Sequence, residues 1–261
     1  MLLLMVTDKL VKTALVTGGG ARIGRAIAIS LAEAGWRVAI QYGTSELLAN
    51  NTVDEITSKG LKASAFKADF SREGEVNVLL DAINKKFGIV SCLINNASVF
   101  ENDSFLTSSR ESWDLHMEVN LRAPFLLSQI FANHLPEETQ GNIINIVDQR
   151  VLNLTEYFTS YTLSKSALWT LTQTAAMALA PNIRVNAISP GPTLPSSRQT
   201  DQEFEKQAKS MPLKRAVSLN DIEQAVMFIL KTSSMTGEMI TIDSGQHLGW
   251  AQPDQTSDLE E

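Results

Sequence analysis

Short runs of apolar residues alternate with longer amphipathic stretches along most of this 261-residue chain. Continuous apolar runs are typical of strands covered on both faces, whereas apolar positions that recur every three or four residues are typical of helices. On this basis we predict strands at 13–17, 37–41, 62–67, 91–95, 142–147, 184–188 and 239–242. We predict helices at 23–34, 46–58, 73–87, 111–135, 156–180 and 219–231.

The order of these elements predicts the fold class. Strands that alternate with helices over the whole length pair in parallel through right-handed crossovers. We therefore predict a single doubly wound α/β domain of Rossmann type over residues 1–250, with a parallel seven-stranded sheet and helices on both faces. Residues 189–211 are expected to be the longest irregular segment, typical of a functional lid or of disorder, and residues 251–261 a loose acidic tail.

Composition and charge exclude several classes of partner. A net charge of −7 without a basic stripe disfavours nucleic acid and anionic membrane surfaces. No stretch approaches the roughly 18 apolar residues of a membrane span, and the start MLLLMVTDKL lacks the pattern of a signal peptide. A cytoplasmic protein is therefore expected. The three histidines, His116, His134 and His247, lack ligand spacing, so no catalytic metal is expected.

The segment ALVTGGGARIGR follows the first predicted strand and opens the first predicted helix. Glycines allow a tight turn that brings the backbone close to a phosphate, and the helix N-terminus presents free N–H groups to the anion. A glycine cluster alone also fits a simple turn, but this position in an α/β pattern is typical of dinucleotide binding. We assign Gly18, Arg22 and Ile23 to such a site.

The end of the second predicted strand bears on which dinucleotide is bound. An NAD site usually has a carboxylate there, which accepts from the ribose 2′-hydroxyl. Here the residues before the first acid, Glu46, are Tyr42, Gly43, Thr44 and Ser45. Their hydroxyl and N–H groups suit a 2′-phosphate, and Arg22 and Arg25 add positive charge nearby. We therefore predict NADPH rather than NADH, with Glu46 as the residue that would reverse the preference.

Tyr161-x-x-x-Lys165 spaces a phenol and an ammonium so that both lie on one face of a helix. Asp148 stands thirteen residues before the tyrosine, where a small hydroxyl residue would make a simple ketone-reducing site. We assign all three side chains to catalysis. The plainer alternatives are a chance spacing on an exposed helix face for the pair and, for Asp148, a cap on the loop after its strand.

Several motifs recur in order across nearly the whole chain: TGGGARIG, ADF at 68–70, NNAS at 95–98, Asn120, Tyr161-x-x-x-Lys165 and SPGPT at 189–193. Together they resemble the short-chain dehydrogenase/reductase family. The resemblance implies that Lys165 holds the nicotinamide ribose hydroxyls and that Asn120 anchors a proton-relay water. It implies that the remaining cofactor contacts come from Asp69 at the adenine, Phe70, Asn95, Ala97, Pro190, Gly191 and Thr193.

Three departures from the common family pattern narrow the resemblance: Arg22, Ser98 in NNAS, and Asp148. With Phe100 they resemble the pteridine reductase branch, which includes bacterial dihydromonapterin and dihydrofolate reductases. This implies a pteridine-like small-molecule substrate held by Arg22, Ser98, Phe100, Asp148 and Tyr161. Thr44 departs from the branch, which often has a basic residue there. Arg22 as a solvated surface side chain and Phe100 as ordinary loop packing are the alternatives.

The Asp148 carboxylate bears on which of two kinds of substrate the site can reduce. Hydride addition to a ketone creates an oxyanion, which an ionised carboxylate at about 4 Å would oppose by about 4 kcal/mol at a dielectric of about 20. That energy corresponds to about a thousandfold in rate. A pterin instead has C=N bonds whose nitrogens must gain protons, which a carboxylate can assist. Asp148 would keep the Tyr161 phenol protonated, while Lys165 would lower its pKa.

The predicted function is therefore NADPH-dependent hydride transfer to a dihydropterin or dihydrofolate, with Tyr161 as proton donor assisted by Asp148 and Lys165. A generic carbonyl or 3-ketoacyl reductase is the first alternative, and a non-catalytic NADP-sensing protein is the second. A sensor would have no need of a proton relay, which argues against the second. A homotetramer is implied by the resemblance and by the apolar residues of the helices at 111–135 and 156–180.

Overall fold

The structure is a computed structural model that describes residues 12–196 and 198–249. Its centre is one parallel sheet in the order β3-β2-β1-β4-β5-β6-β7. The strands are β1 (Thr13–Val16), β2 (Arg37–Tyr42), β3 (Ala63–Lys67), β4 (Cys92–Asn95), β5 (Gly141–Ile146), β6 (Ile183–Pro190) and β7 (Met239–Ile242). The strand order reverses between β1 and β4, and ligands bind outside the carboxyl ends of the strands at such a point. The predicted doubly wound Rossmann-type fold is thus confirmed.

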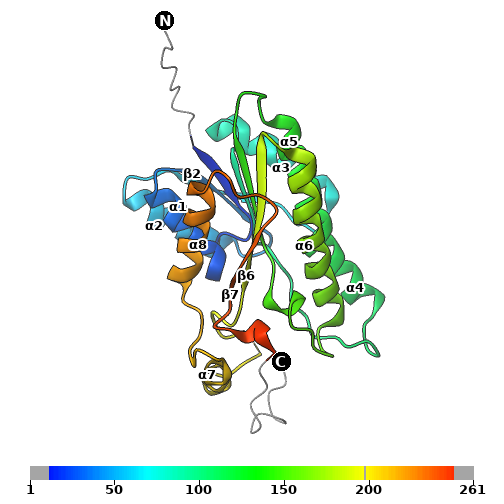
Figure 1. Ribbon diagram of the computed structural model, residues 1–261. Coiled ribbons are helices and arrows are strands. Elements are labelled where there is room, and N and C mark those ends of the chain that lie inside the picture. Colours follow the sequence, from blue (N-terminus) through cyan, green and yellow to red (C-terminus); the bar gives the residue numbers. More distant parts are fainter. Residues whose placement is uncertain (1–11, 197, 250–261) are drawn as a thin grey trace, which may run out of the picture.

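Helices cover both faces of the sheet (Figure 1). One face carries α1 (Arg22–Glu33), α2 (Glu46–Ser58) and α8 (Leu219–Lys231), and the other carries α3 (Glu73–Phe87), α5 (Ala123–His134) and α6 (Thr159–Leu179). Along β1, Ala14 and Val16 pack into the first layer, whereas Leu15 packs into the second. Because successive side chains of a strand point to opposite faces, one short apolar run supplies both halves of the core.

The prediction of one helix over 111–135 is wrong. The structure has α4 (Arg110–Met117), a π-helical turn η1 (Glu118–Arg122) and then α5, which carries Pro124 in its first turn. Proline has no N–H to donate to the carbonyl four residues earlier, so the α-helical ladder is interrupted and a π turn takes its place. The interruption sets the direction of Asn120, which lies within the π turn.

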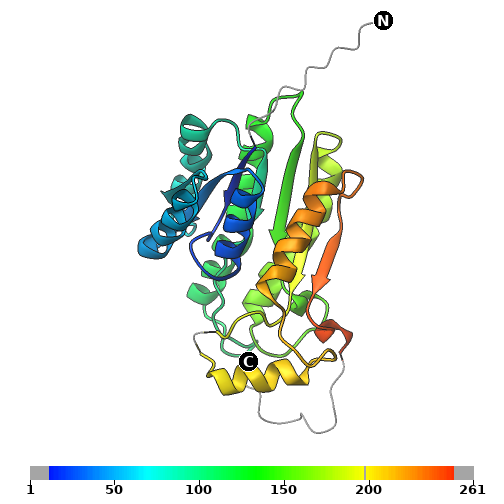
Figure 2. The same cartoon turned by 90° about the vertical axis from the view of Figure 1, so that its left-hand side faces the viewer.

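The expectation of an irregular segment over 189–211 is also partly wrong. Its second half forms α7 (Asp201–Ser210), whose first turn is closed by a capping box. The Glu203 N–H donates to the Thr200 hydroxyl at 3.3 Å, and the Thr200 N–H donates to the Glu203 carboxylate at 2.7 Å. Figure 2 shows α7 lying across the end of the sheet toward which the strands point. The helix α7 therefore covers the carboxyl ends of the strands.

The structure also bears on the ends of the chain, on membrane spans, on Cys92, on metal binding and on assembly. The N-terminal apolar run and residues 251–261 lie outside the described residues. None of the described helices is long and apolar enough to cross a membrane. Cys92 is buried, and burial raises the pKa of its thiol to about 12. Among residues 12–196 and 198–249, no three His, Cys, Asp or Glu side chains are grouped to hold a metal ion. The helices α4, α5 and α6 expose apolar side chains, namely Trp113, Phe125, Leu163 and Met177, and the homotetramer stays a prediction.

Candidate active site

A cavity of about 520 Å³ lies at the carboxyl edge of the sheet, within the size range of small-molecule and cofactor sites. It extends from the glycine turn after β1 to the first turn of α6. The sequence-predicted site residues that line it are Gly18, Arg22, Ile23, Ala97, Ser98, Phe100, Asp148, Tyr161, Lys165, Pro190, Gly191 and Thr193. The structure thus brings the glycine motif, the NNAS motif and the catalytic candidates to one cavity.

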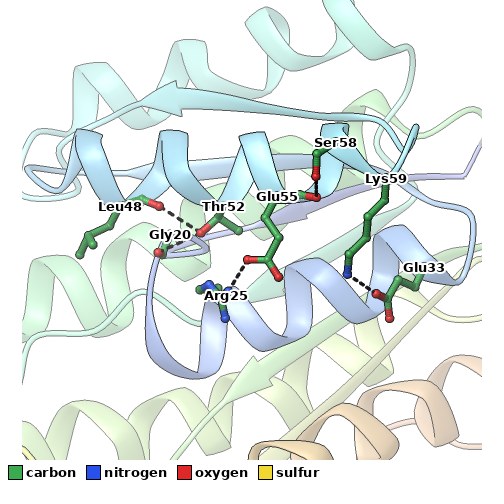
Figure 3. Close-up of polar contacts among 8 residues, drawn as sticks. All are labelled: Gly20, Arg25, Glu33, Leu48, Thr52, Glu55, Ser58 and Lys59. Carbon is green, nitrogen blue, oxygen red and sulfur yellow. Dashed lines mark hydrogen bonds and ion pairs between the residues drawn. The ribbon is translucent and has the colours of Figure 1, made fainter.

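The glycine turn leaves only backbone toward the cavity. Gly18 has a φ of 61°, a conformation that L side chains rarely adopt, and a Cβ there would lie 3.1 Å from the Cα of Ala97. A Cβ on Gly20 would lie 2.8 Å from Ala49, so α2 packs directly on the turn. The Thr52 hydroxyl of α2 donates to the Gly20 carbonyl at 3.1 Å (Figure 3). A turn of this shape fits the phosphates of a dinucleotide.

The NNAS motif is joined to the glycine turn by a short set of hydrogen bonds. The Thr17 hydroxyl accepts from the N–H groups of Asn96 and Ala97, both at 2.9 Å. The Asn96 amide donates back to the Thr17 carbonyl at 2.8 Å. These bonds explain why Ala97 and Ser98 face the same cavity as Gly18 although they lie about eighty residues away in sequence.

Several predicted cofactor residues do not line this cavity: Tyr42, Gly43, Thr44, Ser45, Asp69 and Phe70. They follow β2 and β3 beside the glycine turn, where the Gly19 N–H donates to the Gln41 carbonyl at 3.2 Å. The Asp69 carboxylate accepts from the N–H and hydroxyl of Ser71, which lower its pKa. Phe70 packs in the core. The residues that are predicted to contact the adenosine part of the cofactor therefore lie along this edge of the sheet.

Asn95 is another predicted contact that does not line the cavity. It is buried in the sheet, and its amide donates to the Asn145 side chain at 2.8 Å. Asn145 in turn donates to the Thr172 hydroxyl of α6 at 2.8 Å. The position of Asn95 at the end of β4 correctly predicts that it lies at the carboxyl edge of the sheet. Its side chain, however, points into the interior and joins β4 to α6 through β5.

Asp148 and Tyr161 form a direct hydrogen bond. The Tyr161 hydroxyl donates to Oδ2 of Asp148 at 2.8 Å, while Oδ1 of Asp148 accepts from the Arg150 N–H at 2.8 Å. The loop cap considered for Asp148 is therefore present together with the contact to the tyrosine. Burial raises the pKa of Tyr161 well above its usual value, and the charge of Asp148 and the hydrogen bond add to the effect. The phenol is therefore held in its protonated form.

Lys165 is buried one helical turn further along α6. Its ammonium donates to the Ile146 carbonyl at 2.8 Å and lies 5.7 Å from the centre of the Tyr161 ring. Burial lowers its pKa to about 8, although the charge of Asp148 acts in the opposite direction. The expectation that Lys165 lowers the pKa of the phenol is not met here, because burial and Asp148 raise that pKa.

Asn120 lies behind the cavity wall rather than in it. Its side-chain oxygen accepts from the Val99 N–H at 2.9 Å and from the Ser98 hydroxyl at 3.1 Å. Its amide donates to the Val99 carbonyl at 3.0 Å and to the Ser164 hydroxyl at 3.1 Å. The side chain therefore joins the NNAS loop to α6, which is a positioning role. The predicted anchoring of a proton-relay water stays a prediction.

The two arginines near the glycine turn have protein partners. The Arg22 guanidinium donates to the carbonyls of Pro195 and Leu194 at 2.8 and 3.1 Å, so it joins the start of α1 to the segment after β6. Arg25 forms an ion pair with Glu55 of α2 (Figure 3). The expectation that Arg25 adds positive charge to the cofactor site is therefore wrong, because Glu55 offsets that charge. Arg22 still lines the cavity.

Phe100 belongs to an aromatic group that the sequence reasoning missed. Its ring stacks on Phe158 at 4.3 Å between centroids and meets the Tyr161 ring edge-on at 4.6 Å. The guanidinium of Arg198 lies 4.9 Å from the Phe100 centroid, and that of Arg150 lies 4.8 Å from the Phe158 centroid. Arg150 lies four residues after the end of β5, close to the carboxyl edge of the sheet, a signal that could have identified it as a site residue. Nothing in the local sequence marks Arg198 or Phe158.

A glycine turn at the switch point of a parallel sheet, with tyrosine and lysine at the end of the same cavity, defines a dinucleotide-dependent oxidoreductase. The family profile described as Enoyl-(Acyl carrier protein) reductase matches residues 20–247. A curated relative, 3-oxoacyl-[acyl-carrier-protein] reductase FabG of Staphylococcus epidermidis, is 31% identical over 242 residues, which cover 91% of this chain and 99% of the relative. The chain belongs to the short-chain dehydrogenase/reductase family.

Solved structures give nearer matches. FolM Alternative dihydrofolate reductase 1 from Brucella suis, in complex with NADP, has a TM-score of 0.90 and 44% identity, covering 96% of this chain and 99% of that one. The FolM protein from Brucella canis, complexed with NADP, has a TM-score of 0.89 and 44% identity, covering 93% and 96%. A blue fluorescent protein from a metagenomic library, in complex with NADPH, has a TM-score of 0.83 and 29% identity, covering 90% and 97%.

Proposed function

We propose that this protein is an NADPH-dependent reductase that transfers a hydride to a pteridine of the dihydropterin or dihydrofolate type. The observation that carries the proposal is the 2.8 Å hydrogen bond from the Tyr161 hydroxyl to the Asp148 carboxylate. A carboxylate in this position suits a substrate whose ring nitrogens gain protons. The similarity to two FolM proteins at 44% identity supports the same substrate class.

The cofactor is NADP(H), in keeping with the NADP and NADPH complexes of the three similar structures. When bound, NADPH supplies the hydride. Its phosphates would be held by the turn at Gly18 and the start of α1, because a helix N-terminus favours an anion. Lys165 would hold the nicotinamide end, and Pro190, Gly191 and Thr193, which line the same cavity, would contact the cofactor as well.

The protein's own part in the reaction is proton delivery and positioning. Hydride addition to a C=N carbon leaves negative charge on the nitrogen, which then takes a proton. Tyr161 holds that proton because burial and Asp148 keep its phenol neutral. Asp148 accepts hydrogen bonds from the donor groups along one edge of the heterocycle. Its negative charge also favours reprotonation of the Tyr161 phenol after the proton has been transferred.

A second candidate, reduction of a 3-ketoacyl substrate, is favoured by the 31% identity to FabG proteins. The Asp148 carboxylate opposes it, because an alkoxide forming beside Tyr161 would meet a negative charge 2.8 Å from the phenol oxygen. A non-catalytic sensor is a third candidate. It does not account for a tyrosine, an aspartate and a lysine that meet in one cavity.

A panel of substrates distinguishes these candidates. We expect the purified protein to oxidise NADPH with dihydrobiopterin, dihydromonapterin or dihydrofolate, with kcat/KM at least about tenfold above that for a small β-keto ester. Absorbance at the nicotinamide band would follow all four reactions side by side. Faster turnover of the keto ester would favour the ketoacyl reductase, and cofactor binding without turnover of any substrate would favour the sensor.

Cofactor choice gives a separate prediction. We expect NADPH to bind at least about tenfold more tightly than NADH, since a charge-assisted contact to the 2′-phosphate contributes about 1.5 kcal/mol or more. Equilibrium titration of both reduced cofactors would measure this. Glu46 lies beside Tyr42, whose pKa is raised first by burial and then by the charge of Glu46. Glu46→Gln should therefore widen the preference, and equal binding of both cofactors by the parent would contradict the prediction.

A further inference from the structure

A buried polar cluster lies directly behind Tyr161 and belongs to no role assigned so far. Asp103 follows β4 in the loop that carries Phe100, His116 lies near the end of α4, and Ser160 lies in the first turn of α6. Their exposed fractions are 5%, 0% and 0%. Side chains of this polarity are rarely so deeply buried unless every donor and acceptor is used.

The hydrogen bonds of the cluster define the protonation state of His116. The Glu101 N–H donates to Nε2 of His116 at 3.1 Å, so Nε2 is an acceptor and carries no proton. The proton of a neutral ring is then on Nδ1, which donates to the Ser160 hydroxyl at 2.7 Å. The Ser160 hydroxyl donates in turn to the Asp103 carboxylate. The relay runs in one direction, from the Glu101 N–H to a carboxylate.

Asp103 also holds the N-terminus of the helix that carries the catalytic residues. The residue before α6, Phe158, has a left-handed φ of 58° and provides no side-chain cap. Instead the Asp103 carboxylate accepts from the Ser160 N–H at 3.1 Å, and its carbonyl accepts from the Phe158 N–H at 2.6 Å. A carboxylate at a helix N-terminus is favoured by the helix dipole. The cap of α6 therefore comes from the loop after β4.

The relay connects two parts of the active site that are far apart in sequence. Ser160 directly precedes Tyr161, and Glu101 directly follows Phe100. The Phe100 ring contacts the rings of Phe158 and Tyr161, and both Phe100 and Tyr161 line the cavity. The His116 ring also meets Tyr161 edge-on at 6.0 Å. A shift of the loop relative to α6 would thus move the phenol and the Phe100 ring against each other.

We propose that Asp103, Ser160 and His116 form a positioning relay, which holds the Phe100 loop and the Tyr161 phenol in one working geometry as long as His116 is neutral. The relay acts through Tyr161 and Phe100, so it does not depend on which substrate is reduced. None of its three members lines the cavity, and none is expected to touch substrate or cofactor.

Charge accounts for the pH dependence of the relay. Burial lowers the pKa of His116, while the charge of Asp103, the Ser112 carbonyl and the charge of Glu101 act in the opposite direction. The Tyr161 phenol, which faces the ring from α6, is neutral. Protonation would put a hydrogen on Nε2, opposite the Glu101 N–H, and two donors cannot share a bond. The relay is therefore complete above about pH 6.5, the usual histidine pKa, and is lost at a lower pH, as the pH falls through the lowered pKa of His116.

Three variants test the relay. His116→Phe removes both ring partners, Ser160→Ala breaks the link to Asp103, and His116→Gln keeps one acceptor and one donor. We expect His116→Phe and Ser160→Ala to lower kcat by about tenfold or more and leave NADPH affinity within about twofold, with partial rescue in His116→Gln. The acid limb of the pH profile, present in the parent, should be absent in His116→Gln. His134→Gln is the matched control, because that exposed histidine of α5 pairs only with Asp81 and the Ile130 carbonyl among its recorded contacts.

Amide hydrogen exchange at Glu101 gives a readout that needs no substrate. In the parent this N–H should be protected at neutral pH and should lose protection as the pH falls through the lowered pKa of His116, whereas His116→Phe should exchange at least about tenfold faster than the parent at neutral pH. Unchanged exchange at Glu101 in His116→Phe would overturn the proposal. So would an acid limb that persists in His116→Gln, because the cluster would then be an ordinary part of the core.

Discussion

Replacing Tyr161 by phenylalanine is expected to lower kcat by at least about a hundredfold, toward loss of turnover, while leaving cofactor affinity nearly intact. A positioned general acid contributes about two to four orders of magnitude. The change removes only the hydroxyl, which donates to Asp148, and the ring keeps its contacts with Phe100 and His116. Single-turnover rates with bound NADPH, together with equilibrium cofactor titration, would separate the two effects.

Lys165→Ala is the companion variant and should behave differently. In the parent, the Lys165 ammonium donates to the Ile146 carbonyl, and Lys165 lines the cavity. Loss of this side chain should therefore weaken cofactor binding as well as turnover. If Tyr161→Phe kept most of the parent activity, Tyr161 would not be the proton donor. A weakened cofactor affinity in Tyr161→Phe would indicate that the phenol has a binding role instead.

Replacing Asp148 by serine is expected to lower pteridine turnover by about tenfold to a thousandfold, the range for a lost proton-transfer group. Activity toward an activated ketone should hold or rise, because a neutral donor no longer opposes the developing alkoxide. Asp148→Asn is the control that keeps the shape and removes the charge. Both replacements retain an oxygen that can accept from the Arg150 N–H, so the turn after β5 should survive. Steady-state kinetics with a pterin and a ketone would measure the change in preference.

Replacing Asp148 by serine should also change how activity depends on pH. After burial, the charge of Asp148 is the next cause that raises the pKa of Tyr161. Removing that charge lowers the pKa, so the phenol loses its proton at a lower pH and the alkaline limb moves down. If both variants reduced pterins as well as the parent does, Asp148 would act only as the cap of the turn. The protein would then be an unspecialised reductase of its family.

Local patterns in the sequence were sufficient to predict the fold class. The interior of a parallel sheet requires continuous apolar runs, and β1, β4 and β5 have them at the predicted places. The glycine turn and the Tyr161–Lys165 spacing are also local, because each depends on a few consecutive residues. The capping signature of α7, Thr200 with Glu203, was equally visible in the sequence, and the expectation of an irregular segment there overlooked it.

Contacts between segments that lie far apart in the sequence could not be predicted from such local patterns. Arg25 was expected near the cofactor because it follows the glycines, yet its charge is offset by Glu55 of α2. Asn95 ends a strand at the correct edge, but whether its side chain faces the cavity or the interior depends on Asn145 of the next strand. The interruption of the helix at Pro124 follows from a missing N–H, but the π turn that replaces it, which packs against α6, was not predicted from the sequence.

The sequence by itself determined the layers of the fold, the family and the residue types of the catalytic group, since these depend on periodicity and short motifs. Only the tertiary structure decided which atoms meet. It joined Asp148 to Tyr161, directed Arg22 to the segment after β6, and buried His116 between the loop after β4 and the start of α6. The physical reason is that hydrogen-bond direction and burial depend on groups that lie dozens of residues apart and meet only when the chain is folded.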